Sequence, residues 1–380
     1  MNLIDLSSNL IKFKSISPKS AGSIEYIADL LKKKKFDCHM LEFGQKKIKN
    51  LYAEFSNGSG PNLCFAGHCD VVPPGDVKEW DSDPFDPLIK DGRIFGRGAC
   101  DMKPAIAAFL FSTLKFLDDF KNVFNGTLSF LITADEEGDA DFGTKKVVEW
   151  LEDNKFKIDF CIVGEPTNPN FLGEMIKIGR RGSLNGEIVI KGVQGHVAYP
   201  EKAKNPIDNV IKICNAIKLP LDKGSKYFQP SHLEITSIDV GNNVPNLIPS
   251  TAKIKFNIRF NDNHNSSDIK KMLKNRLDSV TKNYKLKTKT SGESFINNTK
   301  DLTQALISSI KRTVNKNPVL STSGGTSDAR FISKICPVLE FGLVGKSMHK
   351  INENSKIKDI EKLSQIYYEF IRNLFIEKKN

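Results

Sequence analysis

Histidine and carboxylate side chains recur in five short motifs, and these residue types bind metal ions or exchange protons. The motifs are GHCDVVPPG (67–75), GRGACDMK (96–103), TADEEG (133–138), VGEPT (163–167) and SMHKINE (347–353). They lie at or just beyond the ends of apolar runs that have the texture of buried strands. Because open α/β sheets bind ligands beyond the carboxyl ends of their strands, we expect these side chains to gather at one edge of a sheet.

The first motif places His68 and Asp70 two residues apart at the end of a strand. The period of two points both side chains the same way and Cys69 the other way. Asp70 could then accept a hydrogen bond from the second ring nitrogen of His68 and orient a metal-bound imidazole. A histidine at a strand end is also common as a structural residue, and this motif alone does not separate the two readings.

The other motifs supply carboxylates. Asp101 precedes a helix expected to start at Pro104, where an acid can also simply stabilise a helix N-terminus. Glu136 and Glu137 form an adjacent pair that is costly to bury without cations, although it would be unremarkable on a surface loop. Glu165 ends a further apolar run. Two histidines and several carboxylates at the ends of separate strands are together the inventory of a two-metal hydrolytic site.

Alternating helical and strand patterns must position these motifs in the first half of the chain. We expect helices over residues 1–17, 24–35, 105–119 and 144–153, and strands over 51–55, 63–67, 128–133 and 160–163. Buried strands that alternate with helices indicate an α/β sheet layered by helices.

The pattern changes near residue 181. Two segments, 185–191 and 253–260, alternate as half-exposed strands, and helical patterns at 206–217 and 267–280 complete the order β-α-β-β-α-β. Buried texture then resumes, with a helix over 302–314 and a strand in 337–342. We therefore predict an α/β protein with a discontinuous catalytic domain, whose mixed sheet is layered by helices, and an inserted α+β domain of ferredoxin-like order. The predicted boundaries are 1–180 and 293–380 for the former and 181–292 for the latter.

Composition supports a folded, soluble protein. The 380 residues carry 56 basic and 45 acidic side chains, a net charge of +11, and 39% of them are hydrophobic, which excludes disorder and a histone-like tail. No apolar run approaches the roughly 18 residues of a membrane span. The opening segment lacks a basic start and a small-residue cleavage site, so we expect a cytoplasmic protein without a membrane partner.

Cysteine and lysine usage agree with this expectation. The seven cysteines are odd in number and form no C-x-x-C pair, which is typical of reduced thiols. We expect Cys69 and Cys100, which lie inside the motifs, to be small buried residues and not metal ligands. Lysine clusters at 32–35 and 282–289 have no accompanying recognition motif, so they favour solvated faces over a nucleic-acid partner.

Nine segments together resemble the di-zinc aminoacylase and carboxypeptidase family, from about residue 3 to the C-terminus and in the family's order and spacing. They are HCDVVPPGD, W-x-x-x-P-F-x-P (80–87), DGRIFGRGACDMK, TADEEG, VGEPT, GRRGS, QGHVAYP, GGTSDARF and SMHKINE. The resemblance implies two zinc ions per subunit, for which cobalt or manganese could substitute. His68, Asp101 and Glu165 would bind one ion. Asp101, Glu137 and His349 would bind the other, with Asp101 bridging.

The resemblance also implies roles for three further residues. Glu136 would be the general base that activates water, and Asp70 would be the hydrogen-bond partner of His68. The inserted domain would form a lid and the interface of a homodimer, from which His196 would reach into the partner's site as an oxyanion donor.

A small-molecule amide carrying several carboxylates is the implied substrate. Its anion receptors would be Arg180, Ser183, Asn246, Arg259, Gly325 and Thr326. Arginine offers a forked donor for carboxylates, and a glycine-rich turn can offer backbone N–H groups. Arg259 could equally be a plain exposed residue of its strand.

Two departures from the family pattern and three alternatives stay open. Pro104 replaces a more usual glycine, and Gly345 and Lys346 stand where some relatives carry asparagine and serine. The run Gly345-Lys346-Ser347 imitates a phosphate loop, but the preceding glycine has the wrong spacing. The alternatives are another amidohydrolase or carboxypeptidase of the family, a metal-free binding protein, and a nucleic-acid binder. Glu136, which no binding role requires, argues against the second.

Overall fold

The computed structural model describes residues 2–377, which form two compact units. The first runs through Ile178 and includes Asn297–Ser321 and the chain from Ser327 onward. The second holds Gly179–Ile296 and the short loop Thr322–Thr326. That loop groups with the second unit because Thr322 donates a hydrogen bond to the carbonyl of Tyr227 and Arg180 donates one to that of Ser323.

An eight-stranded mixed sheet forms the centre of the first unit. Its order is β1 (Asp37–Phe43), β2 (Ile48–Asn57), β6 (Gly126–Thr133), β3 (Asn62–His68), β7 (Phe160–Val163), β18 (Val338–Glu340), β8 (Met175–Lys177) and β17 (Val319–Ser321). Strand β3 pairs in parallel with β6 and β7, and β7 with β18. All residues of β3 and β6 are buried, as expected for strands covered on both faces.

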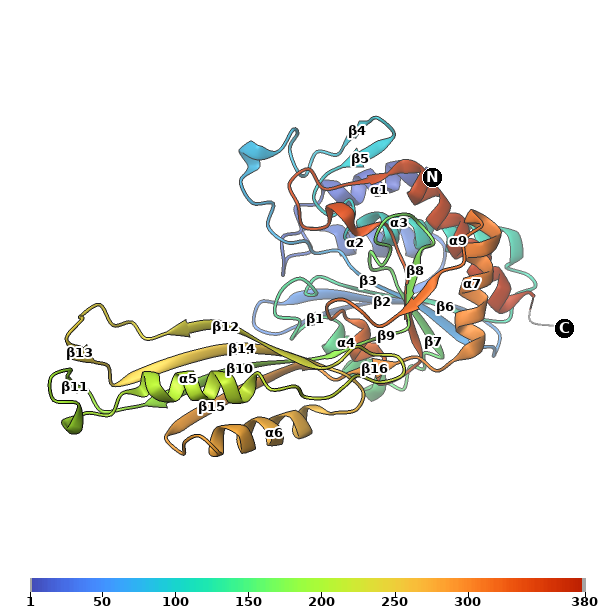
Figure 1. Ribbon diagram of the computed structural model, residues 1–380. Helices are drawn as coiled ribbons and strands as arrows, with labels where there is room; N and C mark the ends of the chain where they lie inside the picture. Colours follow the sequence, from blue (N-terminus) through green and yellow to red (C-terminus); the bar gives the residue numbers. More distant parts are fainter. Residues whose placement is uncertain (1, 378–380) are drawn as a thin grey trace. The chain divides into compact units, whose positions relative to one another are not determined.

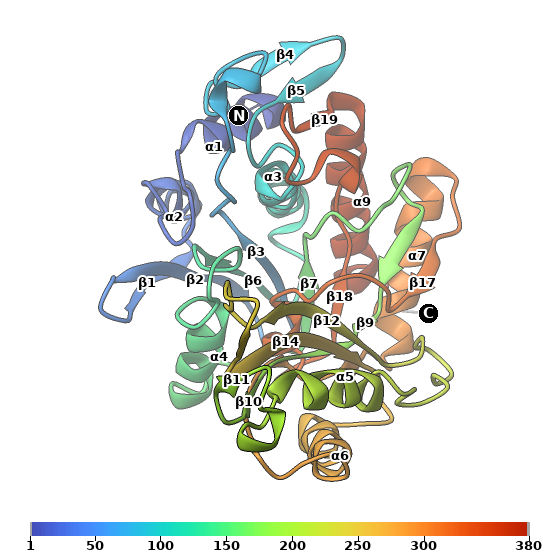
Figure 2. The same cartoon turned by 60° about the vertical axis from the view of Figure 1, so that its left-hand side comes forward.

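Helices cover both faces of this sheet. They are α1 (Leu3–Lys12), α2 (Ser23–Lys33), α3 (Lys103–Phe120), α4 (Thr144–Asp153), α7 (Lys300–Val314), α8 (Ala329–Ile332) and α9 (Ile357–Phe375). Helices α3 and α9 pack together on one face, and α4 lies on the other (Figures 1 and 2). Helix α3 begins one residue before Pro104, so proline stands in its first turn, where a missing N–H costs no hydrogen bond.

A small sheet beside the main one joins two of the motif segments. It consists of β4 (Leu88–Lys90), β5 (Arg93–Phe95) and β19 (Asn354–Lys356). The short 3-10 helices η1 (Val77–Glu79) and η3 (Gly345–Ser347) flank it in sequence. Because β19 pairs with β5, the segment that follows His349 is held against the segment that leads into Asp101.

The second unit is a four-stranded antiparallel sheet with two helices. Its order is β12 (His232–Asp239), β14 (Thr251–Phe260), β10 (Gly182–Lys191) and β15 (Tyr284–Gly292), and α5 (Pro206–Ile217) and α6 (Ser266–Asp278) cover one face (Figure 1). Short pairs join β9 (Gly179–Arg180) to β16 (Phe295–Ile296) and β11 (Gly195–His196) to β13 (Leu247–Ile248). A further 3-10 turn, η2, spans Pro200–Lys202.

The predicted fold class is confirmed: a mixed sheet is layered by helices, and the second unit follows the order β-α-β-β-α-β. The apolar side of β14, which includes Ile254, Phe256 and Ile258, packs under the two helices as its alternation requires. Strand β1 was not predicted, because its burial is only partial and its sequence has no uninterrupted apolar run.

Candidate metal centre

The imidazole of His68 lies among carboxylates at the end of β3. Its Nε2 atom is 3.2 Å from Asp101 Oδ1 and 3.8 Å from Glu165 Oε1. His68 is 1% exposed, Asp101 5% and Glu165 9%. Parallel strands β3 and β7 end at the same edge of the sheet, which is why side chains almost one hundred positions apart in sequence meet here.

A second group forms around His349, and the two groups share Asp101. His349 Nε2 lies 2.8 Å from Glu137 Oε1 and 3.3 Å from Asp101 Oδ2. Each oxygen of Asp101 therefore faces a different histidine, as a bridging carboxylate would. The backbone of His349 has a φ of 62°, an uncommon conformation for a residue with a side chain and one often found at functional sites.

Negative charge exceeds positive charge in this cluster. Five carboxylates, those of Asp70, Asp101, Glu136, Glu137 and Glu165, surround the imidazoles of His68 and His349. Even two imidazolium ions would leave three negative charges in a largely buried space, which is costly without further cations.

The pKa shifts of His349 and Asp101 both favour the charged form of the side chain. Hydrogen bonds that His349 donates to Asp101 and Glu137 raise the pKa of His349 to about 10. Burial works against the charged form of Asp101, but its hydrogen bonds with His349 and His68 hold its pKa below the ordinary value. Protonated imidazoles thus supply part of the positive charge that the surrounding carboxylates require. Oxygen and imidazole donors in two groups of three fit divalent cations such as zinc.

Asp70 contacts this cluster differently from the prediction. Its carboxylate is 3.8 Å from His68 Nδ1, too far for a hydrogen bond, and the Asp70 backbone carbonyl accepts that bond instead at 2.9 Å. The carboxylate accepts the backbone N–H groups of Glu136 and Glu137. The Asp70 side chain lies on the side of the strand that the alternation predicted. It bonds to the TADEEG loop because the backbone of that loop is closer to it than the His68 ring is.

Glu136 lies outside the two groups that share Asp101, but together with His68 and Glu137 it forms a third group of possible metal ligands. Burial and the neighbouring carboxylate of Glu165 raise the pKa of Glu136 well above its ordinary value. A carboxyl group with a raised pKa is suited to take up a proton and return it.

Glu353 and Arg97 were not assigned a role from the sequence, although both lie in the motifs. Glu353 Oε1 accepts the backbone N–H groups of Cys100 and Asp101 at 2.8 and 3.0 Å. Its Oε2 atom accepts a hydrogen bond from the backbone N–H of Gly98 at 3.1 Å and another from the guanidinium of Arg97 at 2.7 Å. Both charged side chains are almost fully buried. The carboxylate thus fastens the loop of the bridging residue Asp101 to the segment that carries His349.

The only sequence feature that could have indicated a role for Glu353 is its place at the end of the SMHKINE motif, four residues after His349. Backbone N–H groups leave no mark in a sequence, so the partners of Glu353 could not be identified. Gly98 has a φ of +86°, and a Cβ there would lie 2.8 Å from Val71, so the loop requires glycine at this position.

All six predicted substrate-binding residues fall in the second unit. Arg180 is nearly buried and lies against the loop of Gly325 and Thr326, since a Cβ on the adjacent Gly324 would be 2.7 Å from its guanidinium. Ser183 on β10 stands directly opposite Arg259 on β14. These residues share one end of the four-stranded sheet.

His196 and Asn246 lie together elsewhere in the same unit. His196 is exposed and pairs with Leu247 in the β11–β13 ladder, and the carbonyl of Asn246 accepts the N–H of Val197. His196 follows the Lys191 end of β10 in sequence, and the pairing of β11 with β13 brings Asn246 to the same end. Strand rise places Ser183 and Lys191 about 27 Å apart, so His196 does not belong to the cluster of Arg259 within its own chain.

Cys69 and Cys100 are free and buried. The thiol of Cys69 donates to the carbonyl of Thr133, and that of Cys100 to Val344. Neither thiol belongs to a metal-ligand group within residues 2–377. In that same range, no helix has the length and apolar composition needed to cross a membrane.

Comparison with known proteins adds a family. The profile of peptidase family M20/M25/M40 matches residues 64–373. A protein of Wolbachia pipientis wMel named succinyl-diaminopimelate desuccinylase is 50% identical over 373 residues, covering 98% of this chain and 93% of its own. A protein of the same name from Pelagibacter ubique (strain HTCC1062) is 51% identical over 382 residues, with 98% and 99% covered.

Solved structures share the fold at low identity. An M20 family metallo-carboxypeptidase, Sso-CP2 from Sulfolobus solfataricus, matches with a TM-score of 0.81 at 22% identity, covering 98% of this chain and 99% of its own. Bacillus subtilis YXEP, described as a dinuclear metal binding peptidase, matches with a TM-score of 0.71 at 17% identity, with 97% and 96% covered.

Proposed function

Because the chain belongs to peptidase family M20/M25/M40, we propose that it is a metal-dependent amidohydrolase with the specificity of its named relatives. It hydrolyses the amide bond of N-succinyl-LL-2,6-diaminopimelate to succinate and LL-2,6-diaminopimelate, a precursor of lysine and peptidoglycan. The observation that supports this proposal best is the position of Asp101 between two groups, each with an acid and a histidine, while Glu136 lies outside both of these groups.

The metal ligands are those implied by the family resemblance. His68, Asp101 and Glu165 would hold one zinc ion, and Asp101, Glu137 and His349 the other. When bound, the two ions would supply Lewis acidity that polarises the amide carbonyl and eases ionisation of water. Cobalt and manganese accept the same oxygen and nitrogen donors and are the expected substitutes.

Glu136 moves the proton in this proposal. Its carboxylate takes a proton from the attacking water as the new C–O bond forms, and gives it to the amine nitrogen as the C–N bond breaks. Asp70 keeps Glu136 and Glu137 in place through their backbone N–H groups, and its carbonyl fixes the ring of His68.

The second unit selects the substrate. Arg180, Ser183 and Arg259 gather at one end of its sheet beside Gly325 and Thr326, and a substrate with three carboxylates needs several such donors. Lys346 replaces a residue that contacts a carboxylate in some relatives, so one of these contacts is made differently here.

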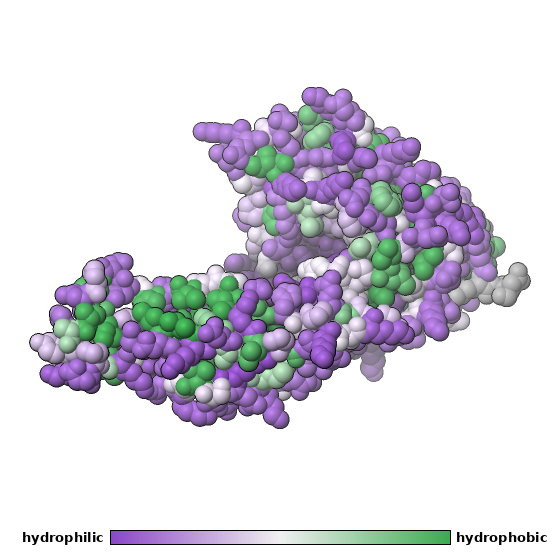
Figure 3. Space-filling view, in the orientation of Figure 1, coloured by the Kyte–Doolittle hydropathy of each residue, from purple (hydrophilic) through white to green (hydrophobic). Residues whose placement is uncertain are grey.

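A homodimer explains the separation between His196 and Arg259. If His196 and Asn246 of one subunit complete the site of the other, each substrate meets both clusters although one chain keeps them far apart. Exposed apolar side chains support an interface on this unit: Tyr199, just before η2, and Ile211 on α5 are 55% and 58% exposed. Figure 3 shows apolar residues gathered on the second unit. The inserted domain, residues 181–292, would thus serve as lid and dimer interface in a cytoplasmic enzyme.

A paired substrate assay tests the function. Purified protein loaded with zinc should release succinate from N-succinyl-diaminopimelate at a far higher kcat/KM than it releases acetate from N-acetylornithine. The reverse preference would favour an acetylornithine deacetylase, the alternative within the family, and no amidase activity with bound metal would overturn the proposal. Elemental analysis should find up to two zinc ions per chain.

Subunit mixing tests the dimer. His196→Ala and Glu136→Ala proteins should each be inactive, while their mixture regains activity, since one of the two composite sites in a heterodimer is intact. Absence of recovery despite demonstrated exchange, or full activity of a sedimenting monomer, would show that His196 does not act across an interface.

A further inference from the structure

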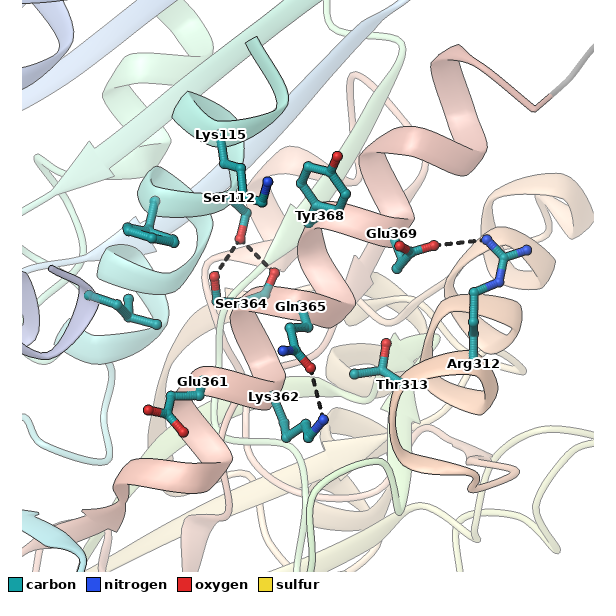
Figure 4. Close-up of a pocket in the computed structure, with 12 residues that line it drawn as sticks. Ser112, Lys115, Arg312, Thr313, Glu361, Lys362, Ser364, Gln365, Tyr368 and Glu369 are labelled. Atoms are coloured by element: carbon teal, nitrogen blue, oxygen red, sulfur yellow. Dashed lines mark hydrogen bonds and ion pairs between the residues drawn. The ribbon is translucent and has the colours of Figure 1, made fainter. Parts of the chain in front are cut away.

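One cavity of the first unit, of about 700 Å³, lies between α3, α7 and α9 (Figure 4). Its polar side chains pair with one another: Arg312 with Glu369, Ser112 with Ser364, and Lys362 with Gln365. A cavity whose polar side chains are engaged in this way gives no indication of a ligand. A buried lysine beside the proposed metal centre is a stronger sign of a role that the sequence did not assign.

Lys103, the first residue of α3, is completely buried. Within residues 2–377 its ammonium group has one hydrogen-bond acceptor, the carbonyl of Phe13 at 2.8 Å. The Lys103 Nζ atom also lies 5.9 Å from the centre of the Phe85 ring. Lysine is rarely buried completely, because the ammonium ion loses its hydration and needs partners in return. One hydrogen bond to a carbonyl is a small return for that cost.

Two carboxylates near Lys103 favour its charge. Burial disfavours the ammonium form of Lys103, whereas the charges of Glu353 and Asp70 favour it. Asp70 binds the backbone of the TADEEG loop, and Glu353 binds that of the loop of Asp101. Because a charged carboxylate accepts such bonds better than a neutral one, the buried ammonium ion supports both loops.

Residues 13–17, which we call the N-terminal strap, supply the carbonyl acceptor and lie along the chain that follows His68. Ser15 is completely buried, and its Oγ donates to the carbonyl of Cys69 at 2.6 Å. The N–H of Val71 donates to the carbonyl of Ser15 at 2.9 Å, and a parallel bridge pairs the two segments. The strap therefore fixes the backbone directly after His68.

We propose that Lys103 and Ser15 are positioning residues that hold His68 against Asp101. Lys103 binds the strap, and Ser15 of the strap binds the chain after His68. Lys103 also follows Asp101 by two residues, and a Cβ on Gly98 would lie 2.9 Å from Lys103 Cδ, so the loop that leads to Asp101 packs on the lysine stem. The two ligands are thus connected through one buried lysine.

The other metal-ligand group is fastened separately. Glu353 holds the loop of Asp101 against the segment that carries His349. Loss of Lys103 or of the Ser15 hydroxyl should therefore displace His68 relative to Asp101 and leave Asp101 and His349 in place. A purely structural role would weaken both groups alike. This inference rests on the metal ligands of the proposed function and not on the identity of the amide substrate.

Cobalt titration of full-length proteins that keep one of the two histidines separates the groups. The His349→Ala protein binds an ion through His68, and the His68→Ala protein binds one through His349. Added to the first, Lys103→Met should lower the cobalt affinity about ten-fold or more, and added to the second, less than about two-fold, by calorimetry at pH 7. In the first protein the visible absorption of bound cobalt should change as well, because a displaced imidazole alters the ligand geometry.

Ser15→Ala is the second variant, because it removes one hydrogen bond without changing the charge. It should give the same pattern at a few-fold magnitude, and it decides the question if Lys103→Met fails to fold. The matched control is Ser112→Ala on α3, whose hydroxyl also donates to a carbonyl, that of Ser364 (Figure 4). Ser112 belongs to no metal-ligand group of the described chain, so this change should alter neither affinity.

Three outcomes would overturn the inference. Equal losses in the two one-histidine proteins, or no loss in either, would show that Lys103 and Ser15 do not align His68. Tighter binding in both would show that Lys103 acts only through its charge, since removal of a nearby positive charge favours cations without any change of position. If neither one-histidine protein bound cobalt before these changes, the metal ligands of the proposed function would be wrong as well.

Discussion

The two units of this chain treat buried polar groups in opposite ways. In the first unit, five carboxylates gather around two imidazoles and leave negative charge that no side chain of the cluster neutralises. In the second, the carboxylate of Asp222 accepts hydrogen bonds from Gly224, Ser231 and Asn261, and lies 3.2 Å from His264. All three bonds go to Oδ1 of Asp222, and Oδ2 has only the nearby imidazole of His264. One carboxylate thus meets several donors in the second unit, whereas in the first unit five carboxylates outnumber two imidazoles, a surplus of negative charge that cations from outside would balance.

The functional side chains differ in the same way. Those of the first unit are fixed at the buried ends of parallel strands, where small displacements would separate the ligands. Arg259 stands instead on the half-exposed side of β14. We therefore expect changes in the first unit to affect chemistry and metal affinity, and changes in the second to affect substrate affinity.

The largest effect is expected from Glu136→Gln. The amide keeps the shape of the side chain but cannot take a proton, so kcat should fall by about 10³-fold or more. Metal content and the unfolding midpoint should stay close to those of the wild type. Steady-state kinetics with elemental analysis provide the measurement, and Glu152→Gln, an exposed position on α4, is the control. Near-normal turnover would mean that the base is another residue.

Glu353→Gln tests whether the first unit depends on the contact that fastens Asp101. The change leaves the buried guanidinium of Arg97 without its counter-charge, which typically costs about 3 to 5 kcal/mol of unfolding free energy. The loop of Asp101 loses its anchor, so zinc affinity should fall by about 10- to 100-fold, as for other residues that orient ligands.

Chelator competition and urea unfolding measure the two effects of Glu353→Gln separately. Glu361→Gln, an exposed change on α9, should alter neither. If zinc affinity stays normal while stability falls, Glu353 supports the fold alone and does not position Asp101.

Arg259→Gln should change substrate affinity and leave the first unit intact. Loss of a forked donor to a carboxylate should raise KM by about ten-fold with little change in kcat, because the contact forms in the ground state as well. Lys255→Gln, four positions along the same face of β14, is the matched control. An unchanged KM would show that Arg259 does not bind the substrate and is an ordinary exposed residue of its strand.

The sequence predicted most of what periodicity and turn chemistry control. The alternation in β14 and the buried runs of β3, β6 and β7 located these strands within a few residues, and helix α4 agrees at both ends. The motifs predicted that histidine and carboxylate side chains would gather at one edge of the sheet, and His68, Asp101 and Glu165 lie close together there. Their grouping as ligands of one ion was implied by the family resemblance and stays a prediction. These features depend on side-chain pattern, which a sequence displays directly.

Contacts made by backbone groups could not be predicted in this way. The carboxylates of Asp70 and Glu353 bind N–H groups of distant loops, and the closer acceptor for His68 is a carbonyl. The assignments of zinc, of the general base and of the dimer remain predictions.

Asp222→Asn should have the smallest effect of these variants, a loss of unfolding free energy in the second unit that depends on pH. Burial raises the pKa of Asp222, but hydrogen bonds from Ser231, Gly224 and Asn261 outweigh it and hold the pKa below its ordinary value. A carboxylate with a lowered folded-state pKa stabilises the protein above its unfolded pKa of about 3.9, and this contribution is lost as the pH falls through the folded value.

The variant should therefore lose about 1 to 2 kcal/mol of unfolding free energy at pH 7, the usual range for such hydrogen bonds to charged groups. Its deficit should be smaller at pH 3 than at pH 7, because the contribution of the charge declines below the unfolded pKa and disappears only below the lowered folded-state pKa. Hydrogen exchange of β14 amides at both pH values measures this, with the exposed Asp262→Asn as control. A deficit that is equal at pH 7 and pH 3 would mean that the charge of Asp222 contributes nothing and that shape alone holds this network.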